Sequence, residues 1–333
     1  MTTSAALGTA TVRSRYATSA RLAMGTINTL RVRHPDADAV MDATFDRMRT
    51  LEARLSTYRP DSEISQVNRA AGHHPVAVSE DVYRVVRRAL DVSVRPGSGF
   101  DITIWPLVKL WRIGSAAAQR PADGDIAAAL ALVDAHAVSL DPATRSVFLP
   151  TPGMGLDLGG IAKGYIADEM AHVLRENGVT SAAIDLGGNV VVLGACHDHA
   201  DGYWRVGIQA PFEARGSCLA VLRLIDSSVV TSGTYERFAD IDGRRYHHLL
   251  DPATGFPFDN DLAAVTIVSA SSLMADAWST VAFAAGADLG LSEVNGSAGV
   301  EAVFVTNDQR VLASDNLAAV LQLSDAYRPR PQA

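Results

Sequence analysis

The sequence predicts an α+β fold with mixed or antiparallel sheets flanked by helices. Some segments carry apolar residues at helical spacing and others alternate between apolar and polar residues. These segments do not follow the strict strand–helix–strand repeat that is typical of a doubly wound parallel sheet. Hydrophobic residues make up 48% of the 333 residues and charged residues 20%, as in a folded domain. We expect one domain over residues 22–325, or two subdomains within it, with flexible segments at 1–21 and 326–333.

The first half of this domain is expected to begin with a strand and to continue mostly with helices. The alternating segment 23–34 predicts the strand. An amphipathic helix is expected over residues 36–58, because Val40, Thr44, Met48, Leu51 and Leu55 follow one another at spacings of three and four residues. A second helix is expected from the N-cap Ser79 to the Pro and Gly residues of RPGSG. A short helix is expected at 123–135, before a hairpin at Asp141.

The second half is expected to contain most of the strands. Residues 155–179 predict the end of a strand, a Gly-Gly turn, and a helix stopped by Gly178 at its C′ position. The segment 181–194 is expected to form one strand. Further strands are expected at 203–211, 218–225, 227–233, 262–270 and 301–307, with a helix at 272–287.

Composition limits the partners and the compartment. The formal net charge of −8 gives no electrostatic reason to expect nucleic acid or an anionic membrane as a partner. The chain has no run of about 20 apolar residues and no signal-like segment at its start, so we expect a cytoplasmic protein without direct membrane insertion. Cys196 and Cys218 lack the spacing of a metal site and are too few for a disulfide framework.

The segment GGIAKG, residues 159–164, is a candidate anion site. It matches neither the G-x-G-x-x-G fingerprint nor the P-loop. Two glycines allow the backbone to approach a ligand, and the start of a helix carrying Lys163 favours negative charge. The alternative is a tight turn between a strand and a helix, with Lys163 in water.

The segment ADAWST, residues 275–280, carries a candidate pair of metal ligands. Asp276 and Thr280 are four residues apart and share one face of the predicted helix, so they offer two oxygen ligands suited to Mg²⁺. The alternative is that Asp276 only favours the early turns of a helix and that the pair faces water.

The segment YHHLLDPATGFP, residues 246–257, combines two histidines with a rigid turn. The tetrapeptide DPAT also occurs at 141–144, where it predicts a plain hairpin connection, so DPAT alone indicates a turn. His247 and His248 would face opposite sides of a strand. One could accept a proton from a hydroxyl while the other is structural, or both could be ordinary core or surface residues.

Taken in order, several blocks of this sequence resemble the ApbE family, the FAD:protein FMN transferases. The resemblance covers residues 22–310 and rests on MGT (24–26), STYRPDSEIS (56–65), GFDITIWPLVKLW (99–111), LDLGGIAKGYIAD (156–168), IDLGGNVVVLG (184–194), SGTYERF (232–238), YHHLLDPATGFP (246–257) and ADAWST (275–280). It implies an ApbE-like fold and an enzyme that uses FAD and Mg²⁺. The activity would transfer FMN from FAD to a threonine or serine hydroxyl of a target protein through a phosphoester bond, with release of AMP.

The resemblance also assigns residues. His248 would be the base and Asp276 would act with it as a catalytic group, with His247 as the base if the alignment is displaced by one residue. Mg²⁺ would be held by the Gly160 carbonyl, Asp276 and Thr280, and many relatives have Ala where this chain has Gly160. The residues expected to contact FAD are Met24, Tyr58, Gly99, Phe100, Asp101, Asp157, Lys163 and Leu249.

Two other functions are weighed against this one. The same site with water as acceptor would make a Mg²⁺-dependent FAD pyrophosphatase that yields FMN and AMP. A non-catalytic flavin-binding module would leave Lys163, Asp276 and His248 without a shared purpose. Many relatives are exported, so either the acceptor of this protein is cytoplasmic or the chain is a mature form. The start at Met1 favours a cytoplasmic acceptor.

Overall fold

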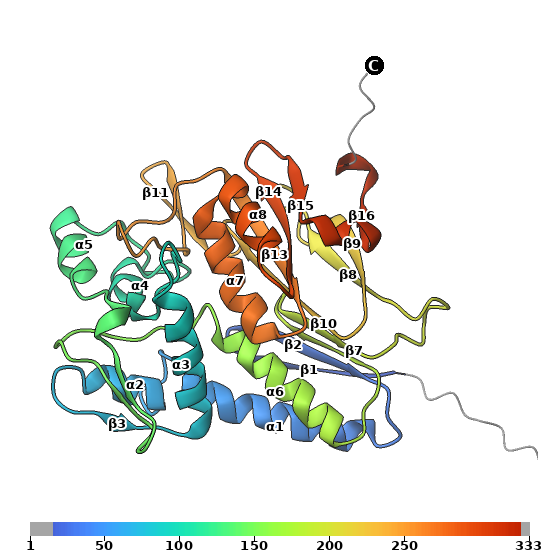
Figure 1. Cartoon of the computed structure of the whole chain (residues 1–333), viewed down its shortest axis with the longest axis horizontal. Helices are drawn as coiled ribbons and strands as arrows, with labels where there is room; N and C mark the ends of the chain where they lie inside the picture. The colour runs from blue at the N-terminus through green and yellow to red at the C-terminus, as the bar shows by residue number, and fades with distance from the viewer. Residues whose placement is uncertain (1–15, 328–333) are drawn as a thin grey trace, which may run out of the picture.

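The computed structural model of the protein describes residues 16–327 and is built on one large antiparallel sheet (Figure 1). The strand order of this sheet is β1-β2-β6-β7-β10-β13-β14-β15, and every neighbouring pair is antiparallel. The α+β prediction is therefore confirmed, in its antiparallel form. The strands are β1 (Ala17–Ala23), β2 (Thr26–Val32), β3 (Val76–Ala77), β4 (Ser139–Asp141), β5 (Ser146–Phe148), β6 (Ala182–Leu186), β7 (Val190–Leu193), β8 (Trp204–Gln209), β9 (Cys218–Leu224), β10 (Ser227–Gly233), β11 (Phe238–Ile241), β12 (Arg244–His247), β13 (Leu262–Ser269), β14 (Val300–Thr306), β15 (Val311–Ala313) and β16 (Leu321–Leu323).

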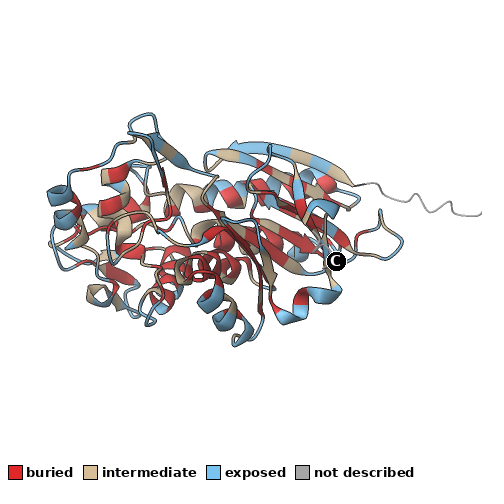
Figure 2. Ribbon diagram, turned by 90° about the horizontal axis from the view of Figure 1, so that it is seen from above, coloured by how far each residue is buried: buried red, intermediate tan, exposed pale blue. Residues whose placement is uncertain are grey.

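Helices cover one face of the large sheet. The α-helices are α1 (Ala37–Leu55), α2 (Glu63–Arg69), α3 (Glu80–Ser93), α4 (Trp105–Trp111), α5 (Asp123–Leu130), α6 (Ala162–Glu176), α7 (Ser272–Ala285) and α8 (Ala287–Asn295), and short 3₁₀ turns lie at η1 (Ile102–Ile104), η2 (Ala135–Ala137), η3 (Asp315–Ala319) and η4 (Asp325–Tyr327). The main core forms where α1, α6, α7 and α8 meet the sheet, and Figure 2 shows buried residues along this interior.

Strand β13 lies inside the sheet, between β10 and β14, and all eight of its residues are buried. Val265 and Ile267 join the core under the helices. Ala264 and Val268 join a second core, which a smaller sheet of β16, β9 and β8 covers from the other side. Because successive side chains of a strand face opposite sides, a strand buried on both faces needs an unbroken apolar run, as LAAVTIVS nearly is.

Several sequence expectations differ from the structure. Residues 17–21, expected in a flexible segment, belong to β1, whereas residues 1–15 and 328–333 lie outside the described part of the chain. The segment 181–194 forms a hairpin, β6 and β7, instead of one strand. Its turn is Gly187–Gly188, and both residues have positive φ, which a two-residue hairpin turn of type I′ requires. Residues 155–158 are irregular rather than the end of a strand.

Other local expectations are confirmed. Ser79 is the N-cap residue of α3, although its side chain makes no capping hydrogen bond. Gly178 follows α6 with φ +79°, and the hydrogen bond from Val179 N to Leu174 O closes the helix as expected for a C′ glycine. Within residues 16–327, no helix combines the length and the apolar character needed to cross a membrane.

Candidate active site

The Gly-Gly segment is a loop that leads directly into α6. The Asp157 carboxylate accepts a hydrogen bond from Gly159 N at 2.7 Å, and Asp157 N donates to Ile102 O at 2.7 Å. The second bond joins this loop to the segment that carries Asp101. Helix α6 begins at Ala162, so Lys163 lies in its first turn. Partial positive charge at the start of a helix and the ammonium group of Lys163 together favour an anion here.

Helices α6 and α7 cap each other. Asp168 of α6 accepts hydrogen bonds from Ser272 N at 2.8 Å and Leu273 N at 3.0 Å at the start of α7. Asp276 of α7 accepts one from Gly164 N at 2.8 Å in the first turn of α6. A Cβ on Gly164 would lie 2.2 Å from Ser272 O, so only glycine permits this close crossing. The crossing carries Asp276 to the start of α6.

This arrangement leaves three oxygen atoms without hydrogen bonds to other described residues. Gly164 N donates to Asp276 Oδ2, so the carbonyl of Gly160 is not used by the first turn of α6. Within residues 16–327, Asp276 Oδ1 and the Thr280 hydroxyl also form no hydrogen bond. Thr280 Oγ1 would lie 3.4 Å from a Cβ placed on Gly160, so these residues are neighbours. The residues expected to hold a metal therefore lie together.

The chemistry of these donors suits a hard cation. One carboxylate, one carbonyl and one hydroxyl are oxygen ligands, which Mg²⁺ prefers, and water or substrate phosphate would supply the remaining ligands. The described residues contain no group of three His, Cys, Asp or Glu side chains that could hold a metal. A site of this kind depends on its substrate for part of its coordination.

The two histidines face opposite sides of the hairpin formed by β11 and β12. His247 pairs with Phe238. The His247 side chain is 9% exposed, and its Nε2 lies 2.9 Å from Phe258 O. His248 is half-buried, and its Nδ1 lies 3.2 Å from Arg237 O. Because a carbonyl only accepts, Nδ1 carries the hydrogen in neutral His248, and the lone pair of Nε2 stays free.

The electrostatic surroundings keep His248 neutral. Burial lowers the pKa of His248 to about 4, and the positive charges of Arg237 and Lys163 act in the same direction. Lys163 also favours the charged form of Asp276, although burial is the larger effect and raises the pKa of that carboxyl group. Lys163 therefore acts on both His248 and Asp276, which come from segments far apart in the sequence.

Residues 99–101 pack beside the Gly-Gly loop. Gly99 has φ +60°, and a Cβ there would lie 2.2 Å from Ala284 Cβ of α7. Phe100 is buried, with its ring 3.0 Å from a Cβ placed on Gly160. An alanine at position 160 would therefore press against this ring. The Asp101 carboxylate caps η1 by accepting hydrogen bonds from Thr103 N at 2.7 Å and Thr103 Oγ1 at 2.6 Å.

The other residues expected to contact FAD surround this centre at different depths. Tyr58 is 74% exposed and its ring lies edge to face on Trp105, with centroids 5.5 Å apart. Leu249 is buried and its carbonyl accepts a hydrogen bond from Phe258 N at 3.0 Å. Met24 forms the tip of the β1–β2 hairpin, where its N–H donates to Glu52 at 2.6 Å. No hydrogen bond joins Met24 to the other expected residues within 16–327.

Two residues of the site were missed at the level of sequence. Asp168, the last residue of GYIAD, accepts hydrogen bonds from the start of α7. The sequence around Asp168 does not predict a partner outside its own helix. Arg237 supplies the carbonyl that binds His248, and its charge acts on Asp157, Tyr58 and His248. The motif SGTYERF contains Arg237 but does not reveal which groups it would face.

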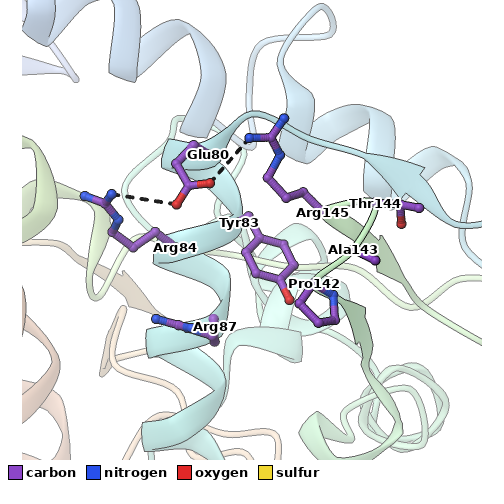
Figure 3. Close-up of a pocket in the computed structure, with 8 residues that line it drawn as sticks. All are labelled: Glu80, Tyr83, Arg84, Arg87, Pro142, Ala143, Thr144 and Arg145. Carbon is purple, nitrogen blue, oxygen red and sulfur yellow. Dashed lines mark ion pairs between the residues drawn. The ribbon is translucent and has the colours of Figure 1, made fainter.

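Two cavities accompany the two DPAT turns. One of about 400 Å³ lies between α3 and the first turn and contains none of the expected site residues (Figure 3). Its walls are Glu80, Tyr83, Arg84, Arg87, Pro142, Ala143, Thr144 and Arg145. The other, of about 240 Å³, lies on the His247 side of the second turn. The candidate site is defined by its converging polar groups rather than by either cavity.

The fold and the candidate site suit one class of protein, and comparison with known proteins identifies its family. The α+β scaffold, with an anion-favouring helix start beside a set of oxygen ligands and a neutral histidine, suits a protein that binds an anionic ligand. The sequence pattern of the ApbE family matches residues 24–304, and the chain belongs to this family. The resemblance inferred from the sequence blocks is confirmed.

Relatives and solved structures agree with this assignment. The chain is 42% identical over 277 residues to a FAD:protein FMN transferase of Klebsiella pneumoniae, covering 83% of this chain and 85% of that protein. It is 36% identical over 329 residues to a FAD:protein FMN transferase of Treponema pallidum, covering 94% and 91%.

Among solved structures, the ApbE protein of Thermotoga maritima superposes with a TM-score of 0.84 at 26% identity, covering 92% of this chain and 99% of that one. The apo flavinyl transferase ApbE of Pseudomonas stutzeri superposes with a TM-score of 0.79 at 28% identity, covering 92% and 96%.

Proposed function

We propose that this protein transfers the FMN half of FAD to a threonine or serine hydroxyl of a target protein, forming a phosphoester bond and releasing AMP. One observation carries the proposal. The loop at Gly160 and the face of α7 that bears Asp276 and Thr280 meet, and Lys163 couples them electrostatically to His248. The activity in the names of the Klebsiella and Treponema relatives supports it.

The chain supplies groups that suit the diphosphate and a ring system of FAD. Its two phosphates suit the start of α6 and Lys163, where positive potential compensates for the net charge of −8 on the protein. The exposed ring of Tyr58 offers an aromatic face to a ring system of the dinucleotide. Buried Phe100 lies against the loop at Gly160, and the tight Gly99 turn packs on α7, so both support the start of α6.

Mg²⁺ is part of this proposal. The Gly160 carbonyl, Asp276 and Thr280 would hold it, because their free oxygen atoms are neighbours and are of the type that it prefers. When bound, the ion would neutralise charge that develops on phosphoryl oxygens. Asp168 would act indirectly, because it fixes the start of α7 and thereby the position of Asp276.

His248 would be the general base. Its Nε2 is free to accept a proton, since Nδ1 is held by the carbonyl of Arg237. A pKa of about 4 keeps the imidazole neutral at pH 7. His247 is less suited to this role, because it is buried and its Nε2 is bound to Phe258 O. Deprotonation of an acceptor hydroxyl contributes about 10²–10⁴-fold to the rate of such reactions.

Mass spectrometry of a co-expressed target protein tests this function. We expect a threonine or serine of the target to gain the mass of FMN minus one water molecule. Asp276→Ala should abolish this adduct, because the loss of a carboxylate removes a metal ligand and a cap of α6. Asp288→Ala in the first turn of α8 is the control for loss of an aspartate and should leave the adduct intact.

The assay also separates the alternative activities. Release of AMP and free FMN at the full rate with no acceptor present would indicate a pyrophosphatase instead of a transferase. Bound FAD that never yields AMP would indicate a non-catalytic flavin-binding module. The cytoplasmic location stays a prediction.

A further inference from the structure

Arg237 lies directly across from His248 on the same face of the β11–β12 hairpin. Phe238 pairs with His247 in the ladder, and the hydrogen bond from His248 N to Arg237 O, at 3.1 Å, continues this register by one residue. Directly opposed residues of an antiparallel pair place their side chains on the same face. Arg237 and His248 therefore share one face, whereas Phe238 and His247 share the other.

Within residues 16–327, no hydrogen bond or ion pair of the side chain explains why an arginine stands at position 237. The residue is exposed, and its aliphatic carbons lie beside Gly114, where an added Cβ would be 3.5 Å from Arg237 Cδ. Among the described residues, the guanidinium group forms no ion pair. Its charge nevertheless acts on Asp157, Tyr58 and His248. The register of the hairpin places it on the face of His248, beside the candidate site.

We propose that Arg237 binds the phosphate groups of FAD and stabilises the departing AMP, an inference that rests on the transfer function proposed above. The protein is acidic overall, yet Arg237 and Lys163 place two positive charges around one histidine. A guanidinium group is planar and can donate to two phosphate oxygens at once, which an ammonium group cannot do with the same geometry. Arg237 therefore complements Lys163 rather than duplicating it.

The transfer step gives this charge its purpose. The acceptor oxygen forms a bond to the phosphorus of the FMN half, and the bond from that phosphorus to the bridging oxygen breaks. The acceptor proton moves to His248 Nε2, and the electron pair of the broken bond stays on the bridging oxygen, which leaves as part of AMP. Negative charge grows on that oxygen during the step, so a guanidinium group donating there stabilises the transition state more than bound FAD.

The test compares Arg237→Gln with wild type in steady-state transfer to the target protein. The substitution leaves the backbone carbonyl at position 237 in place, so its hydrogen bond with His248 Nδ1 is kept. The variant therefore reports on the loss of the guanidinium group alone. We expect kcat/KM for FAD to fall about 10- to 100-fold, as for loss of a charged hydrogen bond. Arg237→Lys should lower kcat/KM less than Arg237→Gln but should not reach the wild-type value. A lysine keeps the positive charge but cannot donate two parallel hydrogen bonds from one planar group.

The matched control is Arg245→Gln. Arg245 lies on the same hairpin but on the face of His247, and its guanidinium group binds Asp240 at 2.9 and 3.1 Å. This variant should stay within about twofold of wild type, as for exposed ion pairs. In Arg237→Ala, millimolar guanidinium ion should restore part of the activity, and the same addition should not raise that of wild type.

Two results would overturn the inference. One is an unchanged kcat/KM in Arg237→Gln when the wild-type protein transfers FMN. This result would contradict the role of Arg237 but not the proposed transfer function. The other is an equal loss in Arg237→Gln and Arg245→Gln, which would assign the effect to the hairpin. A wild-type protein that transfers no FMN to any target would instead contradict the function on which the inference rests.

Discussion

The two DPAT turns of this protein have the same local structure and different surroundings. Asp141 accepts hydrogen bonds from Ala143 N at 2.9 Å and Thr144 Oγ1 at 2.7 Å. Asp251 accepts the corresponding bonds from Ala253 N at 2.8 Å and Thr254 Oγ1 at 2.9 Å. Even the fifth residue is alike, since Arg145 and Gly255 both have positive φ, at 50° and 76°.

The difference between the turns lies in what packs around them. The first connects β4 and β5 at the surface, and Arg145 reaches Glu80 at 3.5 Å across the cavity of Figure 3. The second is held from inside the protein, where Trp111 Nε1 donates to Gly255 O at 2.8 Å. A Cβ on Gly255 would lie 2.6 Å from Ile126 Cγ2. A common turn thus becomes part of a site when buried contacts fix its position.

The largest expected difference concerns the residue three positions before each turn. This residue is Val138 before the first turn and His248 before the second. His248→Ala should lower the rate of FMN transfer about 10²–10⁴-fold, because the base is lost. Val138→Ala should leave transfer unchanged. The measurement is the rate of adduct formation, with FAD binding followed in parallel, and equal rates for His248→Ala and wild type would remove the base from the mechanism.

The dependence on pH gives an independent view of His248. Its folded-state pKa of about 4 is below the ordinary value of 6.5, so the unfolded chain binds more protons between these values. The contribution of His248 to stability is therefore complete above pH 6.5 and decreases as pH falls toward 4. The kcat/KM of transfer, which reports on the free enzyme, should stay level through pH 6.5 and fall only near pH 4. A fall centred on pH 6.5 would contradict this environment.

The next difference concerns the fifth residue of each turn. Gly255→Ala should lower the free energy of unfolding by about 2–4 kcal/mol, because the new methyl group meets Ile126 and Leu107 and the backbone is left-handed. Arg145→Ala should change it by no more than about 0.5 kcal/mol, since this side chain is exposed. Urea unfolding of both variants measures the two values, and equal values would show that the turns are equally free to adjust.

The smallest expected difference is in the turns themselves. Asp141→Ala and Asp251→Ala each remove the same two hydrogen bonds, so both should cost about 1–2 kcal/mol of stability. Only Asp251→Ala should also reduce FMN transfer, because His248 lies three residues before it. A stability cost that differs by more than about 1 kcal/mol would show that the surroundings, and not only the turn, hold the aspartate.

Local patterns in the sequence predicted much of this molecule correctly. Gly178 ends α6 because the C′ position needs a left-handed residue, and the spacing from Val40 to Leu55 describes the buried face of α1. The Gly187–Gly188 turn was missed, although paired glycines are a known hairpin signal, because the apolar residues on both sides suggested one continuous strand. Such features depend only on residues a few positions apart.

The sequence by itself determined the α+β class, the family and the residue types of the site, because short-range spacing and the order of motifs carry that information. Only the tertiary structure decided that Asp168 and Asp276 cap each other's helices, that Arg237 lies on the face of His248, and that a buried tryptophan holds one DPAT turn but not the other. The hydrogen bonds of Asp168, Asp276 and Trp111 join residues 104 to 144 positions apart, and they form only when side chains pack in three dimensions.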